Sequence, residues 1–298
     1  MSNRQQPLPE HPSTYVVADR SNQEELHRLH LQDQMLTESQ GGVLPEQPDP
    51  TSFQRVLDVG CGTGGWLIEV AKMYPTVTLL IGVDVSRTFV EYARAQAEAG
   101  QVSDRVEFQV MDALRMLEFP TGFFDLVNQR LGQSWLRTWD WPKLLQEYQR
   151  VARVGGVVRI VESGATKTSP ALTRFSELVL TALYQSGHYF APDWTGVTNQ
   201  LTRLLHQHGL QQVQVHEAAL AYRAGTPRGH LYMEDVRRSL NTLQPFLEKW
   251  TRVPADYQAL CSQVESEIQQ PDFVATLQML TAWGKVPSRK KEREDSPR

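Results

Sequence analysis

The sequence predicts an α/β protein built on a doubly wound, mostly parallel sheet of seven strands. Short apolar runs alternate with amphipathic helical patterns, and a glycine-rich turn follows the first of these runs. Strands that are apolar along their whole length are typical of parallel sheets with helices on both faces. Ligands of such sheets bind beyond the carboxyl ends of the strands, so the residues that follow each strand are the first candidates for a site.

The first 45 residues predict an N-terminal extension that carries one helix. The quartet SNQE, from Ser21 to Glu24, has the pattern of a capping box and opens a helix that runs to about Leu36. Residues 41–50, GGVLPEQPDP, have the composition of a linker. The main domain is expected to span residues 46–284.

The regular alternation begins at residue 55. Strand 55–59 leads through the glycine turn into helix 65–74, which Pro75 ends. Ser86 is expected to cap the second helix of this region, and Gly100 to adopt the left-handed conformation after its last residue. The remaining predicted elements of the alternation are strands 77–83, 106–110, 123–128 and 157–161 and helices 86–99 and 142–153.

After residue 162 the alternation becomes less regular. Stretches near 164–200 and 225–272 are expected to be insertions that form a lid, and residues 285–298 a disordered charged tail. The predicted helices of this part lie near 171–185, 198–208, 231–249 and 256–269, and its predicted strands at 213–217 and 275–283.

The charge, apolar runs and cysteine content of the chain argue against several classes of function. The 298 residues carry a net charge of −4, whereas a dedicated nucleic-acid binder normally has a basic surface. No apolar run has the length of a bilayer span, and the N-terminus lacks the apolar stretch of a secretory signal. The two cysteines, Cys61 and Cys261, suggest neither a disulfide framework nor a metal site. We therefore expect a cytoplasmic protein that binds no nucleic acid, membrane or metal.

The turn in RVLDVGCGTGGW matches two cofactor patterns at once. Gly60, Gly62 and Gly65 have the spacing of a dinucleotide site, but Asp58 precedes the first glycine by two residues. A carboxylate is unfavourable beside a pyrophosphate and favourable beside a cation. S-adenosylmethionine has no phosphate and carries an ammonium and a sulfonium. The turn therefore favours S-adenosylmethionine over NAD.

Two further acids end predicted strands. Asp84 lies 24 residues after Gly60, where a carboxylate accepts the ribose hydroxyls of either cofactor. Asp112 follows the third strand, and the Asp112–Ala113 pair offers an acceptor to the adenine amino group and a backbone N–H to a ring nitrogen. No tyrosine has a lysine four residues later, so the Tyr-x-x-x-Lys pair of one large dehydrogenase class is absent.

From about Tyr15 to Glu162 the chain resembles the class I S-adenosylmethionine-dependent methyltransferases, which have a seven-stranded Rossmann-like sheet. The resemblance rests on VLDVGCGTG, LIGVDVS, VEFQVMDAL, FDLVNQRL and LLQEYQRVARVGGVVRIVES. It looks closest to the bacterial small-molecule branch, in which a tyrosine and an E-x-x-R-L-x-x-Q helix precede the domain. Here these are Tyr15 and a helix from Glu25 to Gln32 that is one residue longer than that pattern.

The resemblance implies roles for individual residues. Gly60 and Gly62 would contact the methionine part of the cofactor, Asp84 the ribose and Asp112 with Ala113 the adenine. Asp58 would organise the turn and the ammonium. Further candidate cofactor-binding residues are Tyr15, Gly64, Val85, Asn128 and Gln129.

The acceptor is expected to be a small, partly apolar molecule that receives the methyl group by SN2 displacement. An oxygen acceptor is the first choice, then nitrogen or carbon, and the chain is compatible with a homodimer. His188 and Glu162 are the candidate bases, because a base is needed mainly for a hydroxyl acceptor. The candidate acceptor-binding residues are Arg130, Trp135, Tyr184 and Tyr189. The alternatives are an NAD-dependent oxidoreductase and a cofactor-binding module without catalysis.

Overall fold

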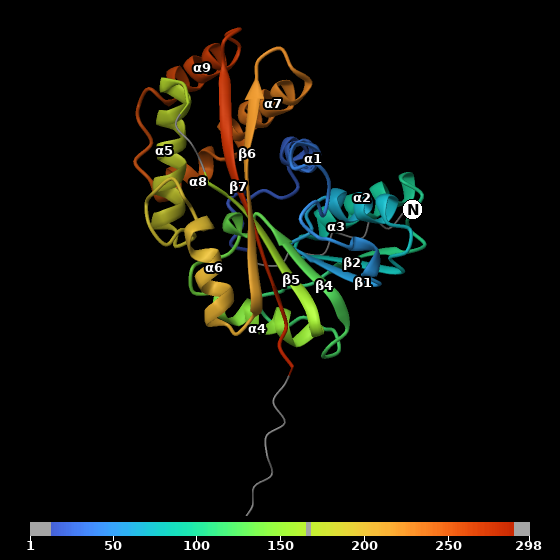
Figure 1. Ribbon diagram of the computed structural model, residues 1–298. Coiled ribbons are helices and arrows are strands. Elements are labelled where there is room, and N and C mark those ends of the chain that lie inside the picture. Colours follow the sequence, from blue (N-terminus) through green and yellow to red (C-terminus); the bar gives the residue numbers. More distant parts are fainter. Residues whose placement is uncertain (1–12, 165–167, 289–298) are drawn as a thin grey trace, which may run out of the picture.

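The computed structural model describes residues 13–164 and 168–288. Its centre is one seven-stranded sheet in the order β3-β2-β1-β4-β5-β7-β6 (Figure 1). The strands are β1 Arg55–Val59, β2 Leu79–Asp84, β3 Val106–Val110, β4 Phe124–Arg130, β5 Ala152–Gly164, β6 Gln211–Arg223 and β7 Val274–Lys285. The first five strands are parallel, and β7 pairs antiparallel with both β5 and β6. The predicted fold class is confirmed.

Helices pack on both faces of the sheet. They are α1 Gln23–Ser39, α2 Gly65–Met73, α3 Arg87–Ala99, α4 Trp141–Val151, α5 Pro170–Gln185, α6 Thr198–Gln207, α7 Pro227–Thr242, α8 Gln244–Trp250 and α9 Tyr257–Ile268. Two short 3-10 turns, Pro50–Ser52 and Gly132–Ser134, precede β1 and follow β4. In the described part of the chain, no helix is long and apolar enough to cross a bilayer.

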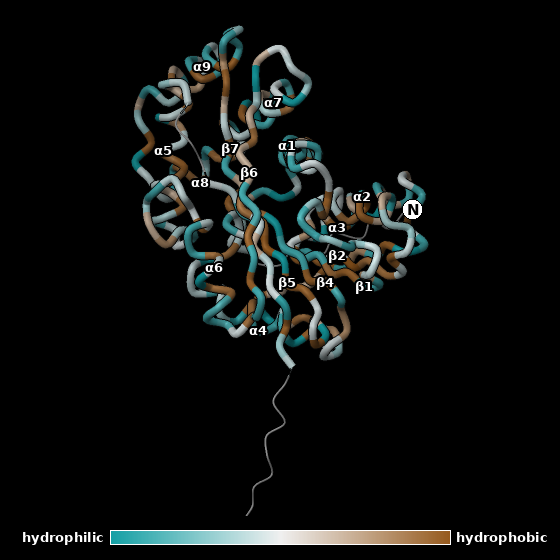
Figure 2. The backbone as a smooth tube through the Cα atoms, viewed as in Figure 1, coloured by the Kyte–Doolittle hydropathy of each residue, from teal (hydrophilic) through white to brown (hydrophobic). Residues whose placement is uncertain are grey.

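Successive residues of the central strands point into two separate apolar layers. Val56 packs into a core with α2 and α3, whereas Leu57 and Val59 pack into a larger core with α4 and α6. This alternation is the two-residue period of a strand buried on both faces. Figure 2 shows the hydrophobic colour along β1 and β4, which lie between these layers.

Helix α1 and the segment between β6 and β7 close over one end of the sheet. β6 and β7 continue beyond their neighbours toward α7 and α9, and α1 lies against α7 (Figure 1). The insertion predicted at 225–272 therefore corresponds to α7, α8 and α9. Of the other predicted segments, residues 1–12 of the extension, 165–167 of the first insertion and 289–298 of the tail lie outside the described residues.

Several local predictions were wrong in detail. The cap of α1 is Asn22, whose side chain accepts from Glu24 N, so the helix begins one residue later than a Ser21 cap requires. Gly100 has φ −78°, and Gln101 after it adopts the left-handed conformation instead. The single helix predicted at 231–249 is two helices, α7 and α8, separated by Leu243.

The fourth strand is also longer than predicted. β4 runs to Arg130, which pairs with Val161 of β5, so Asn128 and Gln129 lie within the strand rather than at its end. Pairing with β5 on one side and β1 on the other extends the strand beyond its apolar run. Both side chains are fully buried in consequence.

Candidate functional site

A cavity of about 460 Å³ lies beyond the carboxyl ends of β1 and β2, with α1 and α7 on its other side. Small-molecule sites commonly have volumes of about 300–1,000 Å³. The predicted site residues that line it are Tyr15, Asp58, Gly60, Gly62, Asp84, Val85, Asp112, Ala113, Arg130 and Trp135. Residues separated by more than 100 positions in the sequence therefore meet at one edge of the sheet.

The glycine turn brings bare backbone to the cavity. Gly60 and Gly62 have φ +69° and +52°, in the left-handed region that favours glycine. A Cβ at Gly60 would lie 2.9 Å from Trp135 Nε1, whereas a Cβ at Gly62 would meet nothing within 4 Å. Gly64 faces the other way, and a Cβ there would lie 2.5 Å from the Phe108 ring. Gly62 thus leaves room for a ligand, and Gly64 serves packing.

Asp84 ties the end of β2 to the glycine turn. Its Oδ2 accepts from Gly62 N at 3.0 Å, and its Oδ1 accepts from Ser86 N at 2.8 Å. Each carboxylate oxygen can accept more than one hydrogen bond. The side chain therefore fixes the turn and the start of α3, and it also lines the cavity.

Asp112 and Ala113 form the next part of the wall. Asp112 Oδ1 accepts from Leu114 N at 3.0 Å, a local bond that fixes the direction of the carboxylate. Met111 N donates to Asp84 O at 2.9 Å and joins this segment to the end of β2. All five of these residues line the cavity.

Asp58 is the first member of a buried polar chain beneath the turn. Asn128 Nδ2 donates to Asp58 Oδ1 at 2.7 Å, and Arg159 Nη1 donates to Asn128 Oδ1 at 2.8 Å. Arg159 is fully buried and pairs with Glu46 at 2.7 Å. Burial raises the pKa of Asp58 to about 7, against the lowering effects of Arg130 and the Asn128 hydrogen bond. Both ends of the Asn128 amide are engaged, and Asn128 does not line the cavity.

Arg130 is paired rather than free. Its guanidinium donates to Asp33 of α1 and lies over the Trp66 ring, 5.8 Å from the centroid. Asp33 and Arg130 both line the cavity. This pair fastens α1 to the end of β4.

Comparison with known proteins identifies the central part of the chain. A family profile described as a methyltransferase domain matches residues 56–156. Ajmaline N-methyltransferase of Rauvolfia serpentina is 35% identical over 127 residues, which is 43% of this chain and 42% of that protein. Chloroplastic tocopherol O-methyltransferase of Arabidopsis thaliana is 30% identical over 177 residues, 58% of this chain and 48% of that protein. Residues 56–156 thus match a methyltransferase domain, and these similarities support the resemblance of the chain to the class I S-adenosylmethionine-dependent methyltransferases.

This chain spans about half the length of the curated methyltransferases that it matches. Among solved structures, phosphoethanolamine N-methyltransferase 2 of Haemonchus contortus, in complex with phosphomonomethylethanolamine and S-adenosylhomocysteine, has a TM-score of 0.52 and 22% identity. That similarity covers 84% of this chain and 52% of the other. The [4+2]-cyclase SpnF has a TM-score of 0.50 and 18% identity, over 94% of this chain and 100% of the other. At such identities the likeness concerns the fold.

The chain holds a second buried polar group around Glu162. Gln129 Nε2 donates to Glu162 Oε1 at 3.2 Å, and Gln133 N donates to Oε2 at 3.2 Å. Tyr148 donates to Gln129 Oε1 at 2.7 Å, so the Gln129 amide is engaged at both ends. Burial raises the pKa of Glu162 to about 8. Neither Gln129 nor Glu162 lines the cavity.

His188 lies outside this cavity, beside the N-terminal segment. Its Nε2 is 3.0 Å from Thr14 O and its Nδ1 is 2.7 Å from Ser186 Oγ. A carbonyl can only accept, so Nε2 carries the proton and Nδ1 accepts from Ser186. Burial lowers the pKa of His188 to about 4. Tyr189 is buried and Tyr184 is 45% exposed, and neither lines the cavity.

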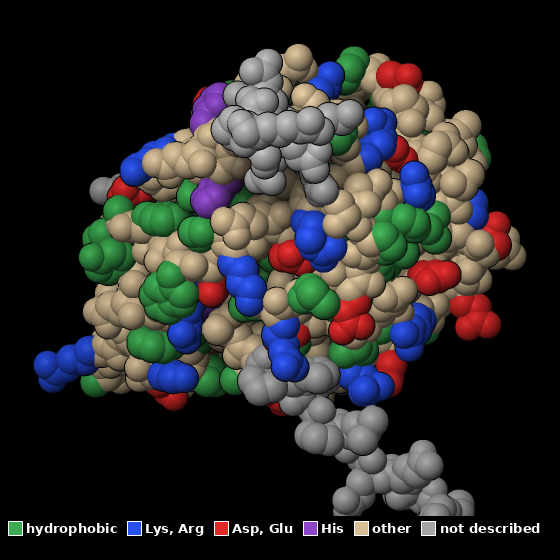
Figure 3. Space-filling model, turned by 90° about the horizontal axis from the view of Figure 1, so that it is seen from below, with side chains coloured by type: hydrophobic (Ala, Val, Ile, Leu, Met, Phe, Trp, Pro, Cys, Tyr) green, Lys and Arg blue, Asp and Glu red, His purple; other side chains and the backbone are tan. Residues whose placement is uncertain are grey.

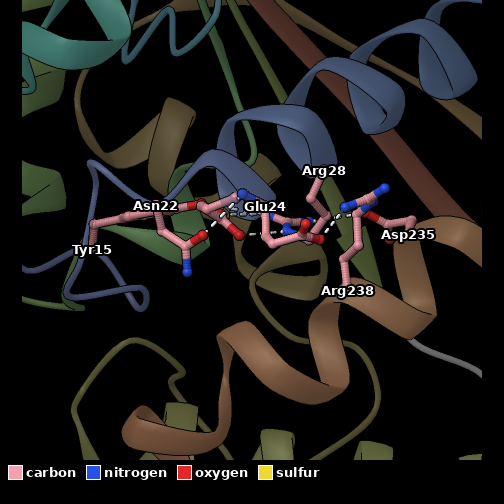
Figure 4. Close-up of polar contacts among 7 residues, drawn as sticks. Tyr15, Asn22, Glu24, Arg28, Asp235 and Arg238 are labelled. Atoms are coloured by element: carbon pink, nitrogen blue, oxygen red, sulfur yellow. Dashed lines mark hydrogen bonds and ion pairs between the residues drawn. The ribbon is translucent and has the colours of Figure 1, made fainter.

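The sequence reasoning predicted Tyr15 as a site residue but missed the charged residues around it. Tyr15, Glu25, Arg28 and Asp235 form a connected cluster between the N-terminal segment, α1 and α7 (Figure 4). Tyr15 OH donates to Glu25, and Arg28 donates to both Glu25 and Asp235. Glu25 and Arg28 are three residues apart on one helix face, so the E-x-x-R spacing of the sequence already indicated that they could pair. No sequence pattern indicates that Asp235 pairs with Arg28, because only the fold brings α7 next to α1.

Gln32 also lines the cavity, although it lies one residue beyond the position that its motif predicts. It follows Arg28 by four residues and so shares a helix face with it. The inward face of α1 therefore presents Arg28, Gln32 and Asp33 to the ligand space.

Proposed function

We propose that this chain binds S-adenosylmethionine in the large cavity and transfers its methyl group to a small acceptor in the same cavity. One observation carries the proposal. The Gly60–Gly62 turn, Asp84 and Asp112 line a single cavity that continues to α1 and α7, so it has a cofactor end and a further space. The activity, the acceptor and the roles below are parts of this proposal.

The residues of the cavity fit a cationic nucleoside better than a dinucleotide. Asp58 reaches the cavity beside the glycine turn and would face the ammonium, which favours its ionised form. Asp84 would accept the ribose hydroxyls, while Asp112 and Ala113 would hold the adenine. Asn128 and Gln129 are proposed as supports of Asp58 and Glu162, because their amides are already engaged at both ends.

When bound, S-adenosylmethionine supplies a methyl group on a sulfonium, which leaves as a neutral thioether. The contribution of the chain is positioning and exclusion of water, which lower the barrier without a covalent intermediate. α1 and α7 cover the cavity, and the Arg28–Asp235 and Arg130–Asp33 pairs hold this cover in place.

The acceptor space is partly apolar. Trp135, Leu131 and Leu243 contribute apolar surface, and Gln133 and Ser239 contribute hydrogen-bonding groups. Such a wall suits a small organic acceptor. On the face shown in Figure 3, basic side chains are intermingled with acidic ones, which supports a small molecule over a nucleic acid. We place the reaction in cytoplasmic small-molecule biosynthesis.

Titration calorimetry tests the cofactor. S-adenosylhomocysteine is expected to bind with micromolar affinity, and NADH is expected to give no heat. Heat with NADH and none with S-adenosylhomocysteine would make the chain an oxidoreductase. Incubation with S-adenosylmethionine and a panel of oxygen, nitrogen and carbon acceptors is expected to release S-adenosylhomocysteine. Binding without release from any acceptor would indicate a binding module.

A further inference from the structure

A second cavity, of about 240 Å³, lies on the other side of the N-terminal segment from the cofactor cavity. Five residues line both cavities: Ser13, Thr14, Tyr15, Val16 and Arg20. The rest of the second cavity is formed by Val17, Ala18, Arg137, His188, Pro245, Phe246, Lys249 and Trp250. Its walls thus come from the segment before α1, the loop after β4, the end of α5 and helix α8.

The two cavities differ in charge. The second cavity is lined by the cations Arg20, Arg137 and Lys249 and, among the described residues, by no aspartate or glutamate. The cofactor cavity is lined by five aspartates and three arginines. Opposite charge in adjacent cavities means that they select different ligands.

Arg137 has unused donors. Its Nε is buried without a hydrogen-bond partner, and no carboxylate of the described chain lies within ion-pair distance of its guanidinium. The guanidinium lies over the ring of Trp139, with its Cζ 5.4 Å from the ring centroid. Asp140 binds the backbone N–H of Arg137 and leaves the guanidinium free. A buried polar group without a partner is costly, and a ligand acceptor would remove that cost.

Lys249 and the aromatic residues complete the cavity. Lys249 Nζ lies 5.4 Å from the Trp250 ring centroid, and Phe246 packs edge-on against His188. His188 is held neutral, since burial lowers its pKa and the nearby Arg137 charge lowers it further. Two cations therefore lie beside an apolar, aromatic surface.

We propose that the second cavity binds the anionic group of a small organic molecule, a phosphate or carboxylate on a flat apolar body. The guanidinium of Arg137 would donate to the anion through two N–H groups, Lys249 would add charge, and Phe246 and Trp250 would pack against the body. This site does not depend on methyl transfer, because none of its evidence comes from the cofactor cavity.

The shared segment couples the two sites. Thr14 accepts from His188 through its carbonyl and donates through its hydroxyl to Trp135 O, and Trp135 lines the cofactor cavity. An anion bound to Arg137 would restrain this segment from the side of the second cavity. The bound cofactor would restrain it from the opposite side. By linkage, each ligand would then change the affinity of the other by the same factor.

Phenyl phosphate is the probe, with benzyl alcohol as the neutral analogue, and calorimetry on the full chain is the measurement. Phenyl phosphate is expected to bind, and more weakly as salt rises, while benzyl alcohol is expected not to bind. Arg137→Gln should raise the dissociation constant at least tenfold. Lys249→Glu, at an exposed position that leaves folding intact, should abolish binding. Arg174→Gln, in an exposed pair with Asp256, is the matched control and should leave it unchanged.

Three results would overturn the proposal: equal affinity for benzyl alcohol, unchanged affinity in both Arg137→Gln and Lys249→Glu, or simple competition between phenyl phosphate and S-adenosylhomocysteine. The last result would place the anion in the cofactor cavity. The anion has two sources: an acceptor that lies in the cofactor cavity and reaches into the second cavity with its anionic group, or a separate effector. Competition of phenyl phosphate with the acceptor in steady-state kinetics identifies the first, and a non-competitive effect identifies the second.

Discussion

Arg28 of α1 donates from Nη1 to Asp235 Oδ1 of α7 at 3.0 Å, across a sequence separation of 207 residues. Both side chains are nearly buried, with 9% and 13% of their surface exposed. Glu25, which is fully buried, binds the other edge of the same guanidinium. One arginine thus joins α1 to α7, in the segment between β6 and β7 (Figure 4). Both Arg28 and Asp235 line the cofactor cavity.

Asp235→Asn tests this junction. The variant removes a charged hydrogen bond but leaves Arg28 paired with Glu25, so we expect a loss of about 1–3 kcal/mol in the free energy of unfolding. Hydrogen exchange should quicken in α1 and α7, and S-adenosylhomocysteine should dissociate faster. Arg174→Ala, which breaks an exposed ion pair far from the cavity, should change neither measurement. Unchanged exchange in α1 would show that the junction does not hold the cover.

Asp84→Ala should weaken the binding of S-adenosylhomocysteine by about 1–3 kcal/mol, because the ribose hydroxyls lose their acceptor in a closed site. The same change leaves Gly62 N and Ser86 N without a partner, so thermal unfolding must be measured beside affinity. Asp104→Ala, at an acid that is 74% exposed, is the control. Wild-type affinity in a folded Asp84→Ala protein would assign the ribose to another residue.

Cofactor affinity should depend on pH through Asp58. Burial raises the pKa of this carboxyl to about 7 in the free protein, and a bound ammonium would lower it. Binding then releases a proton, so affinity should rise between about pH 6 and 8 and level off above that. Calorimetry in buffers of different ionisation enthalpy measures the proton. Asp58→Asn should remove the pH dependence of cofactor affinity. An affinity that does not change with pH in the wild type would contradict the role of Asp58.

Stability should fall with rising pH because of Glu162. Burial raises its pKa to about 8 in the folded protein, from an ordinary value of 4.5. The folded state therefore holds the proton more tightly, and the stabilisation is complete below about pH 4.5 and is lost as pH rises through 8. Urea unfolding from pH 5 to 9 should show a shallower decline in Glu162→Gln than in wild type. Parallel declines in the two proteins would assign the loss to other groups.

His188→Ala separates a positioning role from a basic one. The change removes the partner of Thr14 O and one of the two partners of Ser186 Oγ, so we expect a modest loss of stability and a fall in kcat of less than tenfold. The pH profile of kcat should keep its shape. A general base contributes about 10²–10⁴-fold, so a hundredfold fall with loss of one limb of the profile would make His188 the base.

The sequence determined the fold and the acids that meet at one end of the cavity. β1 and β3 begin and end where the apolar runs do, and Asp58, Asp84 and Asp112 follow from the geometry of parallel strands, because carboxyl ends share one edge. These are local patterns: each strand, turn and acid is specified by residues within about ten positions of it. The site roles assigned to these acids remain predictions.

Only the tertiary structure decided which side chains surround these acids. Asn128 and Gln129 were expected at the cofactor, but pairing of β4 with β5 carries them into the sheet, where buried partners engage both amides. Asp235, the Arg130–Asp33 pair and the cationic second cavity each depend on groups from distant segments meeting. Whether a charged residue is free or paired depends on its neighbours in space, and a sequence pattern specifies only the neighbours along the chain.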